Sequence, residues 1–444
     1  RPARTTPTRE APVAIVTDPT VTSAMTDAEL RAAVRRFVAE AYDPALTLAQ
    51  WWERLADSGW AVPTWPQEWH GLGLPGAAAR TVAEELRAAA VPGPPAGLGL
   101  LLAGPTILAH GTDEQKARYL RPLVDGREAW CQLFSEPGAG SDLASLQTKA
   151  QRDGEEWIVN GQKVWTSGAQ SADFGMLLAR TDPEAPKHKG ISYFAFPMDQ
   201  AGVEVRPLKE MTGRSLFCEV FFTDARVADA DCVGGHGAGW IVANTTLAAE
   251  RAGLGVGGSG SAGGGFPGRK AGMLDLVVGE LMAGAQAQAA QATRAERGGV
   301  LMRRVARELG VADDPLVRQE LAQAYILEEV GRMTSLRAKH LRAAGSGLPG
   351  EGNLAKLQMS RVLRHGRDLG PAIIGPYGTL LGAETPGEGN FQEATIWAPG
   401  PSIYGGSDEI QKNILGERVL GLPKEPGPDK NTPFRDLLVG TQAY

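Results

Sequence analysis

Cysteine is scarce in this chain. The 444 residues include three cysteines, Cys131, Cys218 and Cys232, and no two of them have the C-x-x-C spacing. So small a set excludes the disulfide framework of small secreted proteins and favours a reducing compartment. We therefore expect a cytoplasmic protein that is stabilised by its core.

Histidine, basic charge and long apolar runs are also lacking. The six histidines are scattered without an H-E-x-x-H pattern, so no metal site is expected. The net charge of −6 lacks the basic excess typical of nucleic-acid binding. The most apolar run, residues 96–109, is too short to span a membrane and is interrupted by glycine and proline. It is interpreted as core.

Residue patterns divide the chain into helical and β-rich parts. The length permits two to four structural units with a large core. Apolar residues recur at helical spacing in the first and last parts, whereas short β-prone runs separated by turn residues fill the middle. We predict an extension over 1–24, a helical domain over 25–130, a middle β domain over 131–235, a helical domain over 236–421 and a tail over 422–444.

Local signals support several of these elements. Thr26 supplies an N-cap for a helix that follows it. Further helices are predicted over 270–296, 315–343, 353–370 and 406–418. The Gly-rich run 255–268 is interpreted as a flexible connection. Two G-x-G-x-x-G matches, at 71–76 and 253–258, lack the strand–turn–helix context of a dinucleotide site, and the first is interpreted as a loop.

The first motif with chemical content is SEPGAGSD, residues 135–142. Gly138 and Gly140 allow the backbone N–H groups to turn toward one anion. Ser135 and Ser141 add hydroxyls at the two ends of the loop. On its own, such a loop is more often an ordinary turn.

The second motif is EEWIVNGQKVWTS, residues 155–167. Asn160-Gly161 between two β-prone runs predicts a hairpin turn. Trp165 and Ser167 then share one face of the second strand. A flat ring and a hydroxyl on one face suit a planar cofactor, although a strand tryptophan is more often part of the core.

In this order, the two motifs resemble the flavin-binding segment of the acyl-CoA dehydrogenase family. The family pattern is roughly T-E-P-x-A-G-S-D followed by N-G-x-K-x-W-I-T, and serine replaces threonine here, which keeps the hydroxyl donor. The resemblance extends from about residue 26 to residue 421. It implies the acyl-CoA dehydrogenase-like fold, mainly α with a middle β domain. FAD would lie between the β domain and the C-terminal helical bundle.

The resemblance also implies the reaction, which is α,β-dehydrogenation of an acyl-CoA thioester with electrons passed to an electron-transfer flavoprotein. The base in many members is the Glu of a Y-E-G-T motif, but the matching position here is Gly405. Other members carry the base on a helix beside an arginine, which matches Glu250 and Arg251. Glu250 is the predicted catalytic base, against the alternative of an ordinary pair on a helix surface.

The remaining site residues follow from the resemblance. The predicted substrate contacts are Ser141, Arg251 and Gly405, whose N–H would serve the thioester oxygen. In the family, two segments of a neighbouring subunit complete the flavin site. The first is matched here only by AIIGPYG, residues 372–378, and the second, R-x-x-F-G, is not recognisable in 290–315. The predicted FAD contacts are Gln132, Phe134, Ser135, Gly140, Ser141, Trp165, Ser167, Gly375, Ser407 and Glu409.

Two alternative functions stay open on the sequence alone. One is a flavin oxidase or monooxygenase on the same fold. The other is a non-catalytic subunit of a heteromeric dehydrogenase, suggested by the missing Glu at position 405. A homo-oligomer, dimer or tetramer, is expected, and a heteromer is an alternative. The acyl group is not determined, although Gly405 leaves room for a branched or steroid side chain.

Overall fold

The computed structural model describes residues 21–22, 24–255, 267–292, 298–424 and 431–437. The predicted extension over 1–24 therefore lies almost entirely outside the described residues, as does most of the Gly-rich connection at 255–268. No helix in the described ranges is long and apolar enough to cross a membrane.

The N-terminal part is helical. Thr26 caps the first helix, as predicted, and Thr47 and Thr112 cap two others, each in a capping box with the residue three positions on. The bounds are α1 (Asp27–Ala41), α2 (Leu48–Asp57), α3 (Ala78–Ala88), α4 (Gly104–His110) and α5 (Asp113–Val124), with the π-helical turn η2 (Gly99–Ala103) before α4.

Two tryptophans form the centre of this N-terminal part. Trp51 and Trp52 of α2 are fully buried. Their indole N–H groups donate to the carbonyls of Pro92 and Gly93 at 2.7 and 2.9 Å, so that neither polar atom is left unpaired in the core. The predicted apolar run 96–109 supplies Leu102, which is also fully buried.

The middle part is one eight-stranded sheet in the order β6-β7-β3-β2-β4-β5-β8, with β1 paired in parallel to β4. Most neighbouring strands are antiparallel. The bounds are β1 (Trp130–Leu133), β2 (Lys149–Asp153), β3 (Glu156–Ser167), β4 (Phe174–Arg180), β5 (Ile191–Pro197), β6 (Val203–Leu208), β7 (Phe217–Ala228) and β8 (Cys232–Val233).

The hairpin predicted at Asn160-Gly161 is wrong. Strand β3 runs through both residues, and the turn between β2 and β3 lies at Gly154, where φ is +66°. Gly161 instead sits at a register shift between β3 and β7, with φ of 153°. A Cβ there would lie 2.5 Å from Thr148 Oγ1, so close packing against the residue that precedes β2, and not a turn, requires this glycine.

The C-terminal part is helical again. The four predicted helices correspond to α7, α9, α10 and α12, whereas α8 and α11 were not predicted. The bounds are α6 (Gly239–Gly255), α7 (Val278–Ala292), α8 (Gly298–Glu308), α9 (Pro315–Ala343), α10 (Glu351–Ile374), α11 (Asn390–Trp397) and α12 (Asp408–Ile414).

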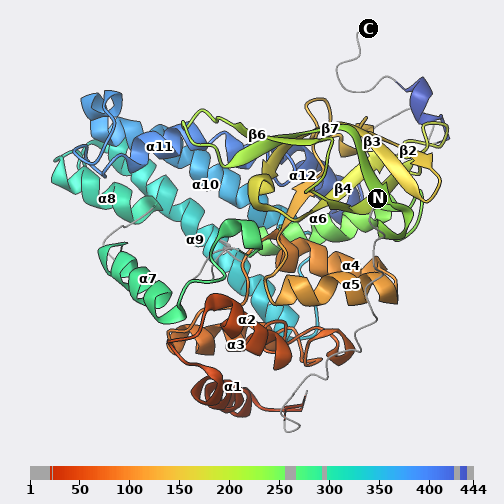
Figure 1. Ribbon diagram of the computed structural model, residues 1–444. Coiled ribbons are helices and arrows are strands. Elements are labelled where there is room, and N and C mark those ends of the chain that lie inside the picture. The colour runs from red at the N-terminus through yellow and green to blue at the C-terminus, as the bar shows by residue number, and fades with distance from the viewer. Residues whose placement is uncertain (1–20, 23, 256–266, 293–297, 425–430, 438–444) are drawn as a thin grey trace.

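Helix α6 occupies a central place in this arrangement. Figure 1 shows α1–α3 at one end of the molecule, and α4, α5 and α6 between them and the sheet. Helix α6 packs against α4, β5 and α10, and therefore touches all three parts. At the β6–β7 end of the sheet, Arg214 forms an ion pair with Glu393 of α11 at 2.5 Å.

The described part of the C-terminal tail returns to the sheet. The N–H of Phe434 donates to the carbonyl of Ala185 at 3.0 Å. The guanidinium of Arg180 lies 3.5 Å from the centre of the Phe434 ring. Arg180 also donates to the carbonyl of Ala144 at 2.7 Å, so the tail supports the end of the loop that follows β1.

Gly161→Ala is expected to destabilise the protein more than Gly154→Ala. A Cβ at Gly154 would enter open space, so alanine there loses only the free energy of placing an L-residue in a left-handed backbone conformation, about 1–2 kcal/mol. Alanine at Gly161 also collides with Thr148, which adds about 1–3 kcal/mol. Urea unfolding of the two variants measures the difference. Equal losses would mean that the bulge accommodates a Cβ without strain.

Candidate active site

The loop after β1 folds back on itself and attaches to β3. The N–H groups of Glu136 and Ala139 donate to each other's carbonyls at 3.1 and 3.0 Å, which closes a tight turn. The carbonyl of Ser135 accepts from the N–H of Val164 at 2.9 Å. Ser135 is half-buried, whereas Gly140 and Ser141 are exposed, so the loop presents its far end to the surface.

A buried ion pair holds this loop in place. Lys163 Nζ lies 2.8 Å from Glu136 Oε1 and donates to the carbonyl of Phe134 at 2.9 Å. The carboxylate also accepts the N–H groups of Gln147 and Thr148 at 2.7 and 2.9 Å. Burial raises the pKa of Glu136, but Lys163 and these hydrogen bonds outweigh it and lower the pKa below its ordinary value.

The sequence reasoning assigned no role to Glu136 or Lys163, although both belong to the two motifs. The signal that could have revealed them is the two-residue alternation of side chains along a strand. Trp157 and Val159 of β3 are buried, and a residue at the same parity, Lys163, is buried completely. A lysine at a core position predicts a buried carboxylate partner, because an unpaired buried charge is strongly destabilising.

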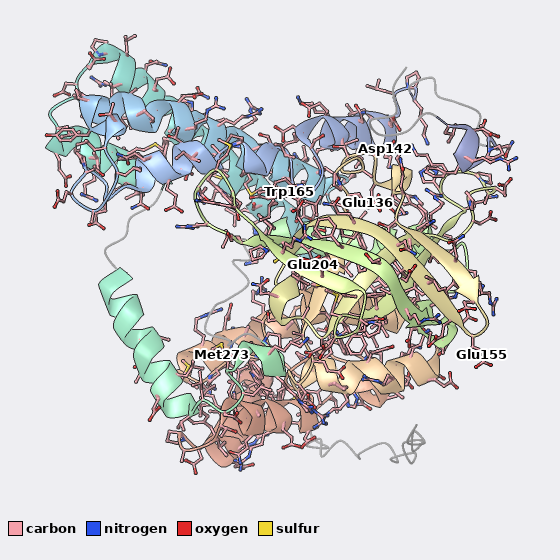
Figure 2. All side chains as sticks on the ribbon, turned by 45° about the horizontal axis from the view of Figure 1, so that its top comes forward. Glu136, Asp142, Glu155, Trp165, Glu204 and Met273 are labelled. Atoms are coloured by element: carbon pink, nitrogen blue, oxygen red, sulfur yellow. The ribbon has the colours of Figure 1, made fainter. Side chains whose placement is uncertain are left out.

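Trp165 stands out from the sheet beside this pair. Its φ is +62°, and its side chain is 57% exposed, with one edge contact to the ring of Phe217 at 5.7 Å. Thr166 is buried, and Ser167 is exposed again. Figure 2 shows Trp165 at the boundary between the sheet and the C-terminal helices. The structure therefore leaves a large ring and a hydroxyl uncovered on one strand.

Helix α6 brings Glu250 to the strand that precedes the loop. Gln132 of β1 donates from Nε2 to Glu250 Oε2 at 3.3 Å, and both residues are half-buried. One turn earlier on α6, Thr246 is bonded to Thr106 at 2.8 Å. The backbone of Arg251 continues α6, but its side chain lies outside the described residues.

The turn at Tyr404 is the third piece of the site that the sequence predicted. Gly405 has φ of +63°, which favours glycine there, and its carbonyl accepts from Gln411 Nε2 at 2.7 Å. Ser407 caps α12 by accepting the N–H of Ile410. Glu409 is exposed, near Lys412.

Buried polar bonds anchor this turn to α10. Lys356 Nζ donates to Asp408 Oδ1 at 3.1 Å, and both side chains are about 2% exposed. Burial raises the pKa of Asp408, but Lys356 and its other partners outweigh that effect and lower it. Asn353 bonds Gln411 at 2.5 Å. The sequence reasoning missed Lys356 and Asp408, whose pairing across 52 positions leaves no local pattern.

The other predicted residues are placed as follows. Phe134 is buried and packs edge-on against Tyr193, so its side chain belongs to the core. Gly375 ends α10 with φ of +53°. It lies 19 residues beyond Lys356, roughly 28 Å along the helix. In the part of the chain that the structure describes, no three His, Cys, Asp or Glu side chains gather to hold a metal ion.

The chain matches known proteins along most of its length. Residues 25–127, 131–225 and 275–420 match the N-terminal, middle and C-terminal domains of acyl-CoA dehydrogenases. Acyl-CoA dehydrogenase IpdE1 of Mycobacterium tuberculosis is 38% identical over 379 residues, which cover 84% of this chain and 88% of that protein. Acyl-CoA dehydrogenase FadE34 of the same organism is 37% identical over 374 residues, covering 83% and 46%.

Solved structures share the fold. The protein described as Tcur3481-Tcur3483 steroid ACAD has a TM-score of 0.62 and 27% identity, covering 90% of this chain and 97% of the other. The ChsE4-ChsE5 complex from Mycobacterium tuberculosis has a TM-score of 0.61 and 27% identity, covering 91% and 100%.

Fold and matches together define an oxidoreductase built from a helical, a β and a second helical domain. The chain belongs to the acyl-CoA dehydrogenase family, whose members generally bind FAD. The resemblance, the fold class and the enzyme class predicted from the sequence are thereby confirmed.

Lys163→Met and Glu136→Gln are each expected to destabilise the protein by about 3–5 kcal/mol, because each leaves a buried charge without its partner. The double variant should lose less than the sum, since it leaves neither charge buried without its partner. Urea unfolding of all four proteins measures the coupling. Strictly additive losses would show that the pair does not act as a unit.

Proposed function

We propose that the chain is an FAD-dependent acyl-CoA dehydrogenase that forms a Cα=Cβ double bond in an acyl-CoA thioester, with Glu250 as its base. Electrons would leave through an electron-transfer flavoprotein. The observation that carries the proposal is the 3.3 Å bond between Glu250 and Gln132. It joins the carboxylate on α6 to the strand that leads into the SEPGAGSD loop, whereas the turn at Gly405 offers no carboxylate.

The residues present fit FAD. Trp165 holds a strained backbone angle and leaves 57% of its side chain uncovered, which suits a ring wall. Ser167 is exposed on the same strand and offers a hydroxyl. Gly140 has no atom within 4 Å of a Cβ position, so that a phosphate or ribose can approach its N–H closely. These residues would hold the flavin, with Ser135 and Ser141 at the loop ends.

The chemistry needs a base and a donor to the thioester oxygen. Bound FAD would accept the hydride from Cβ. Glu250 takes the proton from Cα, and the electron pair of that C–H bond becomes the new π bond as the hydride leaves. The N–H of Gly405 would stabilise negative charge that develops on the thioester oxygen. Half-burial of Glu250 limits competing water at the reacting carbon.

A bulky acyl group is the substrate class that the site supports best. Gly405 removes a side chain from the turn, and the base stands on α6 instead. A structural relative at 27% identity is described as a steroid ACAD. Both observations support a branched or polycyclic acyl group.

The proposed site requires a second subunit. Gly375 is roughly 28 Å along α10 from Lys356, which anchors the turn that carries Ser407, so we propose that Gly375 serves the flavin of a neighbouring chain. Helix α9 supports an interface, because Ile326, Val330 and Met333 are each at least half exposed at helical spacing. The ChsE4-ChsE5 relative is a complex of two named proteins, which supports a heteromer as an alternative to a homodimer or tetramer.

FAD binding at about one molecule per subunit is expected, and Ser167→Ala should weaken it. Loss of one neutral hydrogen bond is worth about 1 kcal/mol, or roughly fivefold in Kd. Fluorescence titration of the flavin-free protein with FAD measures this. Ser171→Ala is the matched control, because Ser171 donates only to a local carbonyl. An absence of flavin binding, alone or with a co-expressed partner, would refute the proposal.

Glu250→Gln is expected to slow anaerobic flavin reduction by roughly 10²–10⁴-fold, the usual contribution of a positioned base. The substrates are saturated thioesters from butyryl-CoA to palmitoyl-CoA, with isovaleryl-CoA and a steroid side-chain thioester. The control is Glu155→Gln, in the turn at the opposite end of β3 from Trp165 (Figure 2). Parent-like reduction of the flavin by Glu250→Gln would place the base elsewhere.

A further inference from the structure

The hydrogen bond between Gln132 and Glu250 has a second consequence. The two residues are 118 positions apart and come from β1 and α6. Gln132 is aligned by the family resemblance with a flavin contact, yet its side-chain amide is directed to the carboxylate. A neutral donor fixed on a strand can hold a carboxylate in one position without forming an ion pair with it.

The backbone of β1 at Gln132 is held rigidly. Its neighbours Cys131 and Leu133 are fully buried, and the backbone is paired with β4. A Cβ on Gly175, which lies opposite Cys131, would be 2.2 Å from Leu133 Cδ1. Strand β1 is therefore packed too tightly against β4 to shift, and the amide of Gln132 leaves from a fixed backbone.

The helix that carries Glu250 is fixed one turn earlier. Thr246 bonds the fully buried Thr106, and Thr245 bonds His110 at 2.7 Å. These two bonds fix the backbone of α6 against α4, but the side chain of Glu250 still has three rotatable bonds beyond it. A contact at the carboxylate itself is needed to select one rotamer.

The neutral amide suits a base better than a cation does. A lysine or arginine in this position would form a charge-assisted bond, roughly twice as strong, and would stabilise the deprotonated carboxylate against accepting a proton. The amide donates to Oε2 at 3.3 Å and carries no charge, so it restrains the carboxylate without forming an ion pair with it.

We propose that Gln132 is a positioning residue for Glu250: its side-chain amide holds the carboxylate at the angle from which it removes the α-proton. This inference rests on the proposed function of Glu250. It assigns the Gln132 side chain to the base, and not to the flavin.

A double-mutant cycle tests the assignment. The four proteins are the parent, Gln132→Leu, Glu250→Gln and the double variant, each assembled with FAD and with its partner chain if one is required. Leucine keeps most of the volume and removes the donor. For each protein we would measure the Kd for FAD, the thermal midpoint and the rate of anaerobic flavin reduction at saturating thioester, using the fastest substrate of the panel above.

The expected result is a loss of roughly 5–50-fold in the reduction rate of Gln132→Leu, because a misplaced base is ineffective. The Kd for FAD and the KM should stay within about twofold. In the Glu250→Gln background the same substitution should change nothing further, since there is no longer a base to position. Gln162→Ala is the matched control: Gln162 also donates to a glutamate, Glu219, at 3.0 Å in the same sheet.

Three outcomes would overturn the inference. If Gln132→Leu weakens FAD binding equally in both backgrounds and the rate effects multiply, the amide belongs to the flavin. If Gln132→Leu behaves as the parent does, the contact has no function. If Glu250→Gln itself reduces flavin at the parent rate, the proposed base fails and the inference fails with it. Only this third outcome also refutes the part of the proposed function that makes Glu250 the base.

Discussion

The buried ion pair between Glu136 and Lys163 is the interaction on which the site depends. A fully buried ammonium is tolerated only with a charged partner, and here the carboxylate of Glu136 accepts one of its N–H groups while the carbonyl of Phe134 accepts another. The same carboxylate accepts two backbone N–H groups at the end of the loop. Moving the loop away from β3 would therefore leave the Lys163 ammonium without its charged partner. Trp165 lies two residues after Lys163, so the same ion pair restrains the position of Trp165.

A second pair, Lys356 and Asp408, has the same role in the C-terminal domain. It attaches the turn that holds Gly405 to α10. Helix α6 packs against β5 and α10 and is held by hydroxyl bonds such as that between Thr246 and Thr106. The proposed site thus draws on three pieces, each fixed to its own support. Such an arrangement would let the proposed base, Glu250, stand on α6 without disturbing the loop or the strand.

Several large apolar side chains are exposed on the single chain, and their positions suit a bound ligand and a neighbouring subunit. Trp165 is exposed beside the loop, and Ile326, Val330 and Met333 are exposed along α9. The first suits a flat ligand, and the others suit a neighbouring subunit. In the proposed dehydrogenase, cofactor and partner would cover the apolar surface that the single chain exposes.

The sequence by itself determined the family and several of the helices. Thr26 marked a helix start, because a capping hydroxyl acts within four residues, and the two motifs carried the family resemblance. The apolar spacing of Leu301, Met302 and Val305 could have revealed α8 as well, since helical periodicity is also local.

Only the tertiary structure decided how the pieces meet. Asn160-Gly161 has strong turn propensity, but contact with Thr148 and the register of β7 made it a bulge. The bond of Gln132 to Glu250 spans 118 residues. Propensity describes a few neighbouring residues, whereas burial and pairing depend on distant segments packing together, and these contacts decided which side chains of the motifs are structural and which are available for chemistry.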